Sequence, residues 1–296
     1  MTAILSDDVA RALTDGRAVV ALESTIFSTL GLPAPANAEA LEVCKQAVLE
    51  YGATPAVAAI IDGRPRLGLT ADEEKRVLQG SRKVAERDLA VAQAQQWDVG
   101  VTTVSATVAL AHAAGISVFA TGGIGGVHRG SELTGDISAD LDAIANHPVI
   151  TVSAGAKAFL DLPKTLEYLE TAGVPVLGWQ HDWFPAFYTR SSGLPVPHRV
   201  DDEQTVCDVL RYRSRPNTGV LLTVPIPEAD EIPESRIAAA LATALEASAG
   251  ITGPAVTPYV LARIEKETDG ESIPANLALA RNNAVIAARI AVALTK

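Results

Sequence analysis

The sequence contains little cysteine and no long apolar run. Cys44 and Cys207 are the only cysteines among 296 residues, too few for a disulfide framework or a zinc cluster. We expect both to be buried free thiols in helical stretches, in a reducing compartment. The N-terminus lacks the basic start and apolar stretch of a signal peptide, and no run approaches the roughly 18 apolar residues of a membrane span. These absences predict a soluble, cytoplasmic protein with no membrane partner.

Positive charge is also scarce. The chain carries 24 Lys and Arg against 35 Asp and Glu, a net charge of −11, and its pI is near 4.9. Nucleic acids and anionic membranes are bound by clustered Lys and Arg that replace counterions. We therefore expect no nucleic-acid partner. A phosphorylated metabolite remains possible because a single loop can supply its donors.

Short β-like apolar runs alternate with helical patterns through most of the chain, without a repeat, a low-complexity tract or an obvious linker. The pattern predicts strands at 18–22, 55–61, 100–104, 116–120, 149–152, 174–177 and 220–224. It predicts helices from an Asn37 cap to Gly52, at 106–114, 136–146 and 166–171, and three more from about Pro233, broken near Gly253 and Gly270. This alternation predicts an α/β protein with helices over a largely parallel sheet, and we expect residues 1–296 to form one domain.

A glycine-rich loop, T-G-G-I-G-G-V-H-R-G at 121–130, follows the run at 116–120. Without Cβ atoms, its backbone N–H groups can approach a ligand closely. Its spacing fits neither the dinucleotide fingerprint nor the phosphate loop. From composition alone, a tight turn that binds no ligand is as plausible as a ligand-binding loop. His128 and Arg129 in the same loop favour an anionic or polar ligand.

Asp136 and Asp140, in D-I-S-A-D, are spaced i, i+4 and would share one face of the helix predicted over 136–146. Two carboxylates beside a phosphate site suit Mg²⁺ or Mn²⁺, which keep several waters. The alternative is that Asp136 caps the helix and Asp140 is a solvated charge. Spacing alone does not decide between them.

Lys157 and Glu23 both follow predicted strands. Lys157 lies among Ala and Gly, where loss of water would lower its pKa and expose a nucleophilic amine; the alternative is a surface lysine that begins a helix. Glu23, in A-L-E-S-T, is a candidate general acid or base, or else a cap. Asn283 in the apolar last helix points either into a cleft or into the core. Lys83, in a charged patch, is predicted from its pattern to be solvated.

Taken together, these stretches resemble the pseudouridine-5′-phosphate glycosidase (pseudouridylate synthase) family, related to indigoidine synthase A-like proteins. The matching segments occur in one order across nearly the whole chain. They are A-L-E-S-T (21–25), R-K-V-A-E-R-D (82–88), T-T-V-S-A-T (102–107), F-A-T-G-G-I-G-G-V-H-R-G (119–130), D-I-S-A-D-L (136–141), S-A-G-A-K (153–157), L-E-Y-L-E-T-A-G-V-P-V (166–176), P-I-P (225–227), T-P-Y-V-L-A-R (257–263) and N-N-A (282–284).

The resemblance implies an α/β/α sandwich around a central, largely parallel or mixed sheet. It also implies that Lys157 attacks C1′ of the ribose, that Glu23 donates a proton and that Asp136 binds one Mn²⁺ per subunit of a homotrimer. Substrate contacts are implied for Lys83, which overturns its assignment to a solvated face, and for further positions. These are Val104, Ser138, Ala139 and Asp140, with Thr121, His128 and Asn283 as further pocket residues.

The implied activity is reversible cleavage of the C–C bond in pseudouridine 5′-phosphate, through a lysine imine, to uracil and ribose 5-phosphate. One departure is Leu30, where family members commonly carry His. It keeps open a C-glycoside synthase that joins ribose 5-phosphate to a different aglycone. Two other classes are a lysine-imine lyase of aldolase type, which would not predict the D-I-S-A-D metal segment, and a non-catalytic sugar-phosphate-binding protein, which would not need Glu23 or Lys157.

Overall fold

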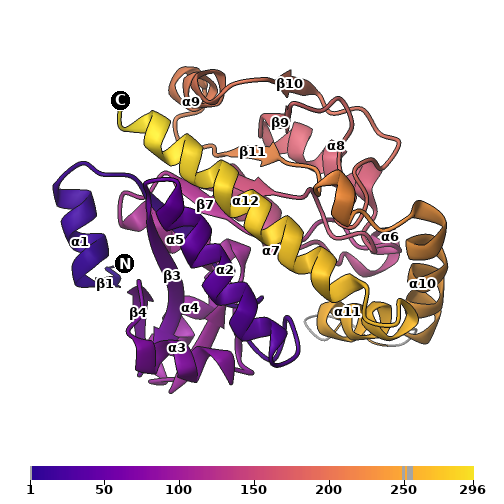
Figure 1. The fold of residues 1–296 in the computed structure, drawn as a ribbon, viewed down its shortest axis with the longest axis horizontal. Helices are drawn as coiled ribbons and strands as arrows, with labels where there is room; N and C mark the ends of the chain where they lie inside the picture. Colours follow the sequence, from indigo (N-terminus) through magenta and orange to yellow (C-terminus); the bar gives the residue numbers. More distant parts are fainter. Residues whose placement is uncertain (1, 249–250, 252–255) are drawn as a thin grey trace.

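The computed structural model describes residues 2–248, 251 and 256–296, and its centre is a mixed β-sheet (Figure 1). Nine strands follow the order β1-β4-β3-β2-β7-β8-β11-β9-β10, and β6 pairs with β3 and with β5. The strands are β1 (Ile4–Leu5), β2 (Val19–Leu22), β3 (Thr54–Ile61), β4 (Arg64–Leu67), β5 (Lys83–Val84), β6 (Val99–Thr102), β7 (Val118–Ala120), β8 (Ile150–Ser153), β9 (Val176–Trp179), β10 (His198–Val200) and β11 (Val220–Thr223).

Parallel pairing runs from β3 through β2, β7, β8, β11 and β9 to β10. The second half of β3 is different, because Ala58–Ile61 pairs antiparallel with β4 and Ala59–Ile61 pairs antiparallel with β6. β2, β8 and β11 in the parallel part are buried along their whole length, as expected when helices cover both faces, whereas the edge strand β10 is mostly exposed. The predicted largely parallel or mixed sheet is confirmed.

Helices cover both faces of this sheet (Figure 1). The helices are α1 (Asp7–Thr14), α2 (Ala36–Glu50), α3 (Ala71–Leu78), α4 (Leu89–Ala94), α5 (Val104–Ala113), α6 (Ser131–Thr134), α7 (Ala139–Asn146), α8 (Leu162–Ala172), α9 (Glu203–Tyr212), α10 (Glu234–Ala247), α11 (Val256–Glu267) and α12 (Ser272–Leu294), with 3₁₀ turns η1 (Glu86–Asp88) and η2 (Glu228–Asp230). α2 and α12 pack together over one face, with α12 against β2, β7 and β8. α5 and α7 pack against each other on the other face. α10 and α11 pack against each other beside the sheet (Figure 1). The molecule is therefore an α/β sandwich.

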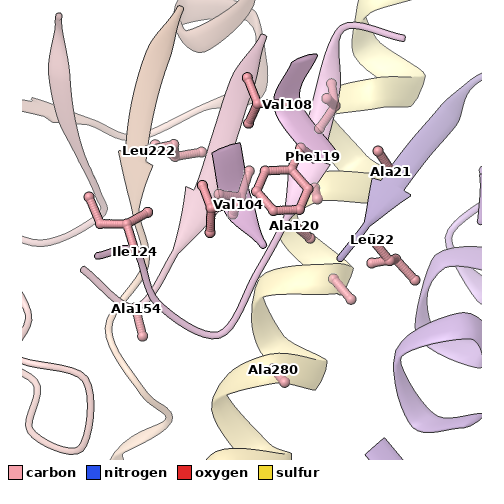
Figure 2. Packing of buried hydrophobic residues seen from close by; sticks show 14 of the residues in the cluster. Ala21, Leu22, Val104, Val108, Phe119, Ala120, Ile124, Ala154, Leu222 and Ala280 are labelled. Carbon is pink, nitrogen blue, oxygen red and sulfur yellow. The ribbon is translucent and has the colours of Figure 1, made fainter. Parts of the chain in front are cut away.

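The core beneath the site is built from small and branched side chains. Figure 2 shows Phe119 of β7 beside Val104 and Val108 of α5, with Ala280 of α12 on the opposite side of the strand. All four residues are buried: Phe119 and Val108 completely, and Val104 and Ala280 to within 1% and 5% exposure. This packing fixes the end of β7, where the glycine loop begins.

One helix, α12, is long and apolar enough to cross a membrane by length and composition. More than half of its most apolar window is buried within the protein, where the helix packs against α2 and three strands of the sheet. Burial between a sheet and a neighbouring helix is the environment of a core helix. Its apolar sequence is explained by that packing.

Three predicted boundaries were wrong. The helix expected over 136–146 begins at Ala139 and is capped by Ser138, so Asp136 precedes it and shares no helix face with Asp140. Val104 begins α5 instead of ending a strand. Asn37 lies inside α2, after the N-cap position of Pro35, and its amide nitrogen donates to Leu78 O (3.0 Å).

The other predicted elements were found. The break at Gly270 separates α11 from α12, whereas the break predicted near Gly253 lies outside the described residues. Cys44 in α2 and Cys207 in α9 are both buried free thiols, as predicted.

Candidate active site

A cavity of about 270 Å³ opens where several strands end on the same side of the sheet. Glu23 directly after β2 and Gly122 shortly after β7 line it, because parallel strands bring their carboxyl ends to one edge. Residues after β5 and β6, which join the sheet by antiparallel pairing of β6 with β3, also line it. It gathers nine of the residues predicted for the site: Glu23, Lys83, Val104, His128, Asp136, Ser138, Ala139, Asp140 and Lys157. Leu30 lines it too, whereas Thr121 and Asn283 lie behind its wall.

Glu23 follows β2 directly, and its side chain is 7% exposed. Burial raises its pKa from 4.5 to about 7; the charges of Lys157 and Lys83 and a hydrogen bond from Thr121 oppose the shift, and the charge of Asp140 adds to it. Thr121 Oγ1 donates that bond to Glu23 Oε1. A carboxyl group with a pKa near neutrality can both give and take a proton at pH 7.

Lys157 lies in a loop after β8, half-buried and lining the same cavity. Its backbone N–H donates to Ile124 O (3.1 Å), and the preceding Ala156 forms a bridge with Ile124, which ties this loop to the glycine loop. No helix begins at Lys157, since α8 starts at Leu162. The alternative of a surface lysine opening a helix is therefore wrong.

Gly155 permits the approach of Lys157 to the cavity. Its φ is +77°, a conformation that favours glycine, and a Cβ there would lie 2.1 Å from Pro185 O. The turn that carries Lys157 is thus fixed by backbone packing.

Lys83 is brought to the cavity by β5, which pairs with Val101 and Thr102 of β6. Burial and the charge of Lys157 lower the pKa of Lys83, while Asp140 and Glu23 raise it. The solvated position predicted from its charged neighbourhood is wrong. Its strand was missed because two residues carry too little periodicity to detect.

The glycine loop packs tightly against α7. A Cβ on Gly125 would lie 2.2 Å from Ser138 Oγ and 2.8 Å from Asp140 Oδ2. The Ser138 backbone N–H donates to Gly126 O (3.0 Å). Contacts within the protein therefore already require glycine at position 125, before any ligand is considered. Arg129 does not line the cavity; its guanidinium donates to Phe159 O (3.2 Å).

Both oxygens of Asp140 accept backbone hydrogen bonds. Oδ1 accepts from Ser105 N (3.0 Å) and Oδ2 from Gly125 N (2.9 Å), and the side chain is 7% exposed. Asp140 is therefore not the solvated charge that the spacing left open. Its carboxylate joins three segments of the cavity wall.

Asp136 and His128 face each other at the cavity, with His128 Nδ1 3.8 Å from Asp136 Oδ2. Burial lowers the pKa of His128, with Asp136 opposing the shift and Lys157 and Lys83 adding to it. No cluster of three potential protein ligands occurs in the described residues. A single partly exposed carboxylate fits an ion that is held mainly by water and substrate oxygens, as Mg²⁺ and Mn²⁺ often are.

Asn283, on α12, holds the start of the glycine loop from behind. Its amide nitrogen donates to Thr121 O (2.8 Å) and Gly122 O (3.3 Å), and its side chain is fully buried. Its side chain points into the core between α12 and the glycine loop. Of the two predicted alternatives, a cleft or the core, the structure shows the core. Asn283 supports the residue that hydrogen-bonds Glu23.

The sequence interpretation did not single out a further polar group in the cavity lining, contributed by Tyr188, Glu265, Ser272 and Asn276. Asn276 Nδ2 donates to Tyr188 Oη (3.0 Å) and Ser272 O (2.9 Å). Burial raises the pKa of Tyr188 to about 12, so the phenol remains protonated. Asn276 interrupts an apolar helix as Asn283 does, and that was the available signal.

A buried acid and a lysine that follow parallel strands and share one cavity define the site of an α/β enzyme. Residues 8–293 match the family model for indigoidine synthase A like protein. The chain is 51% identical to the pseudouridine-5′-phosphate glycosidase of Methylobacterium nodulans, over 97% of this chain and 86% of that relative. It is 50% identical to the protein of that name from Myxococcus xanthus, over 98% of each.

Two solved structures share the fold. The prealnumycin C-glycosynthase AlnA in complex with ribulose 5-phosphate has a TM-score of 0.90 and 38% identity, over 100% of this chain and 97% of that one. An indigoidine synthase A-like protein from Thermotoga maritima has a TM-score of 0.88 and 33% identity, over 95% and 94%. The chain belongs to the indigoidine synthase A-like family.

Proposed function

We propose that this protein is a C-glycosidase that uses water to cleave pseudouridine 5′-phosphate reversibly to uracil and ribose 5-phosphate. The observation that carries the proposal is the meeting of Glu23 and Lys157 in one cavity, close enough for the lysine charge to lower the carboxyl pKa. Relatives that are about half identical to this chain over nearly its whole length are named pseudouridine-5′-phosphate glycosidases, which supports pseudouridine 5′-phosphate as the substrate.

Lys157 is the proposed nucleophile. Its neutral amine attacks C1′, the C1′–O4′ bond breaks, and the proton that the nitrogen releases passes to O4′. The nitrogen then donates its lone pair to C1′, forming C=N, while the C1′–C5 bond breaks and its electrons pass into the uracil ring. Water adds to the imine, releasing ribose 5-phosphate and the free amine.

Glu23 is the proposed proton donor. The leaving atom of the base is carbon, which has no lone pair, so cleavage requires a proton placed on C5 as the bond breaks. A carboxyl group with a pKa of about 7 carries that proton at neutral pH, and it recovers one when water attacks the imine. Thr121 fixes one oxygen of the group.

The cationic side of the cavity is the proposed phosphate end. Lys83, Arg87 and His128 line it, near the N-termini of α5 and α7, where backbone N–H groups favour an anion. Mn²⁺, one per subunit, is part of the proposal, with Asp136 as its protein ligand. Such an ion would neutralise phosphate charge and orient the ligand.

The group around Asn276 is the proposed base end. With its amide nitrogen occupied by Tyr188 and Ser272, Asn276 offers its amide oxygen as an acceptor, and Tyr188 and Glu265 add a hydroxyl and a carboxylate. Uracil presents both N–H donors and carbonyl acceptors. A mixed set of polar groups on that wall supports a polar, nitrogenous base.

A second candidate is a C-glycoside synthase that uses a different aglycone. Leu30 gives the cavity rim an apolar side chain, packed towards Ala59, Ile61 and Val101. The likeness to AlnA also favours it. Both candidates use the same lysine and acid, so they differ in the base alone.

The test is incubation of the protein and Mn²⁺ with pseudouridine 5′-phosphate, and separately with ribose 5-phosphate and a panel of bases, with products identified by mass. Release of uracil supports the proposal, and formation only of a non-uracil C-nucleotide supports the second candidate. Borohydride added with ribose 5-phosphate should give an adduct that maps to Lys157. No turnover and no adduct would refute both.

The proposal includes a single domain spanning residues 1–296, a homotrimeric assembly and a cytoplasmic location. The family match across residues 8–293 supports one functional unit. Light scattering of the purified protein measures the assembly directly. A monomeric mass would overturn the trimer.

A further inference from the structure

We propose that Asp140 is a positioning residue that locks the glycine loop, α5 and α7 together. This inference rests on the proposed function. It is carried by the hydrogen bonds of one buried carboxylate to two segments far apart in the sequence.

Each oxygen of Asp140 has a backbone partner of its own. Ser105 N, in the first turn of α5, donates to Oδ1, and Gly125 N donates to Oδ2. First-turn N–H groups have no partner within their own helix, so Ser105 needs such an acceptor. The two N–H groups therefore fix the carboxylate between the start of α5 and the glycine loop.

The surrounding packing leaves the carboxylate little freedom. Asp140 belongs to the first turn of α7, whose cap Ser138 accepts from Asp140 N (3.3 Å). Gly125 lies so close that an added Cβ would contact Ser138 and the Asp140 carboxylate itself. The negative charge also lies near the N-termini of two helices, α5 and α7, which stabilise it.

The position of Asp140 connects it to both reacting groups. Gly125 lies in the loop that begins with Thr121, the donor to Glu23, and that loop pairs with the segment of Lys157 through Ile124. The groups that face Glu23 are Lys157, Lys83 and Asp140, and the charge of Asp140 raises the Glu23 pKa. Asp140 thus holds the loop in place and supports the protonated acid.

The test compares Asp140→Asn and Asp140→Glu with wild type. Asp142→Asn is the matched control, since it removes one negative charge from the same helix at an exposed position. For Asp140→Asn we expect kcat to fall roughly 100-fold, as misplaced catalytic groups commonly cause, with the Mn²⁺ half-saturation unchanged. The pH above which activity falls should move lower, because the lost charge no longer raises the Glu23 pKa. Asp140→Glu keeps the charge and should keep that pH while kcat falls.

A second measurement needs no turnover. Amide hydrogen exchange at peptides containing Ser105 and Gly125 should be faster in Asp140→Asn than in wild type, and unchanged in Asp142→Asn. If Asp140→Asn does not fold, the exchange rates and kinetics of Asp140→Glu provide the test.

The proposal would be overturned if Asp140→Asn exchanged at the wild-type rate and showed a raised KM or a raised Mn²⁺ half-saturation. Full activity of Asp140→Glu would overturn it as well. A wild-type enzyme without turnover or borohydride adduct would instead refute the proposed function, leaving the exchange test intact.

Discussion

Thr121 donates a side-chain hydrogen bond to the buried carboxylate of Glu23, across the parallel pairing of β7 with β2. Asn283 in turn binds the backbone carbonyl of Thr121 from α12 (2.8 Å). The proposed acid is therefore held by a chain of contacts that ends in the core. This arrangement gives Glu23 a fixed geometry and a water-poor environment. The loss of water raises its pKa, and the hydrogen bond from Thr121 partly opposes that shift.

Replacing Lys157 with arginine should abolish cleavage of pseudouridine 5′-phosphate, because a guanidinium keeps the charge but cannot form the imine. Borohydride should then give no adduct with ribose 5-phosphate, as measured by peptide mass. Lys164→Arg is the control, since Lys164 is an exposed partner of Glu132 and Asp161. An undiminished adduct in Lys157→Arg would assign the imine to another lysine.

Glu23→Gln should lower kcat by roughly 10²–10⁴-fold, the usual contribution of a general acid or base. In the wild type, the donor is protonated below its pKa of about 7, so the rate of cleavage should decline as pH rises through 7. The residual rate of Glu23→Gln should lack that decline. A pH profile of kcat for both proteins checks this, and an identical decline in the variant would point to another group.

The raised pKa of Glu23 also predicts that the Glu23→Gln variant is more stable than the wild type at alkaline pH. Glu23 titrates at 4.5 when unfolded and at about 7 when folded, so its contribution is fully present below pH 4.5 and is lost as pH rises through 7. Above that range ionisation costs up to about 3 kcal/mol, which Glu23→Gln avoids. Denaturant unfolding should find the variant more stable at pH 8 and equal to wild type at pH 4. Equal stability at both pH values would contradict the raised pKa.

Asp136→Asn should weaken Mn²⁺ activation, because an amide oxygen binds a hard cation less well than a carboxylate does. We expect a higher Mn²⁺ half-saturation in the cleavage assay and a loss of wild-type activity with chelator that added Mn²⁺ restores. Asp142→Asn, on the surface of α7, should leave the half-saturation unchanged. Chelator-resistant wild-type activity would remove the metal from the mechanism.

Gly125→Ala should reduce activity sharply, because its Cβ would lie 2.2 Å from Ser138 Oγ and would displace Asp140 from the loop. Gly130→Ala is the matched control: its φ of +78° makes alanine unfavourable by about 1 kcal/mol, but nothing lies within 4 Å of the added Cβ. Kinetics and thermal unfolding of the pair separate loop displacement from backbone strain. Equal losses of activity would attribute the effect to the backbone.

Leu22, Val57 and Val152 illustrate what the sequence could predict about the fold. Each lies in a short apolar run bounded by polar residues or turns, a pattern that indicates a buried strand, and each is in the sheet. β1 and β5 escaped prediction because two residues leave no periodicity to detect. The start of α7 was misplaced because Asp136 and Ser138 are both good caps, and the choice of Ser138 depends on contacts with the glycine loop.

The sequence by itself determined the residue types of the site, since Glu23 and Lys157 had to follow buried strands and the glycine loop had to turn after β7. Tertiary structure alone decided that Asp140 serves two backbone N–H groups and that Asn276 joins the cavity, and it showed how the pairing of β5 with β6 removes Lys83 from solvent. The physical reason is that burial, hydrogen-bond partners and pKa depend on segments distant in the chain. Local patterns specify elements, and only the packing of those elements determines which side chains share one low-dielectric pocket.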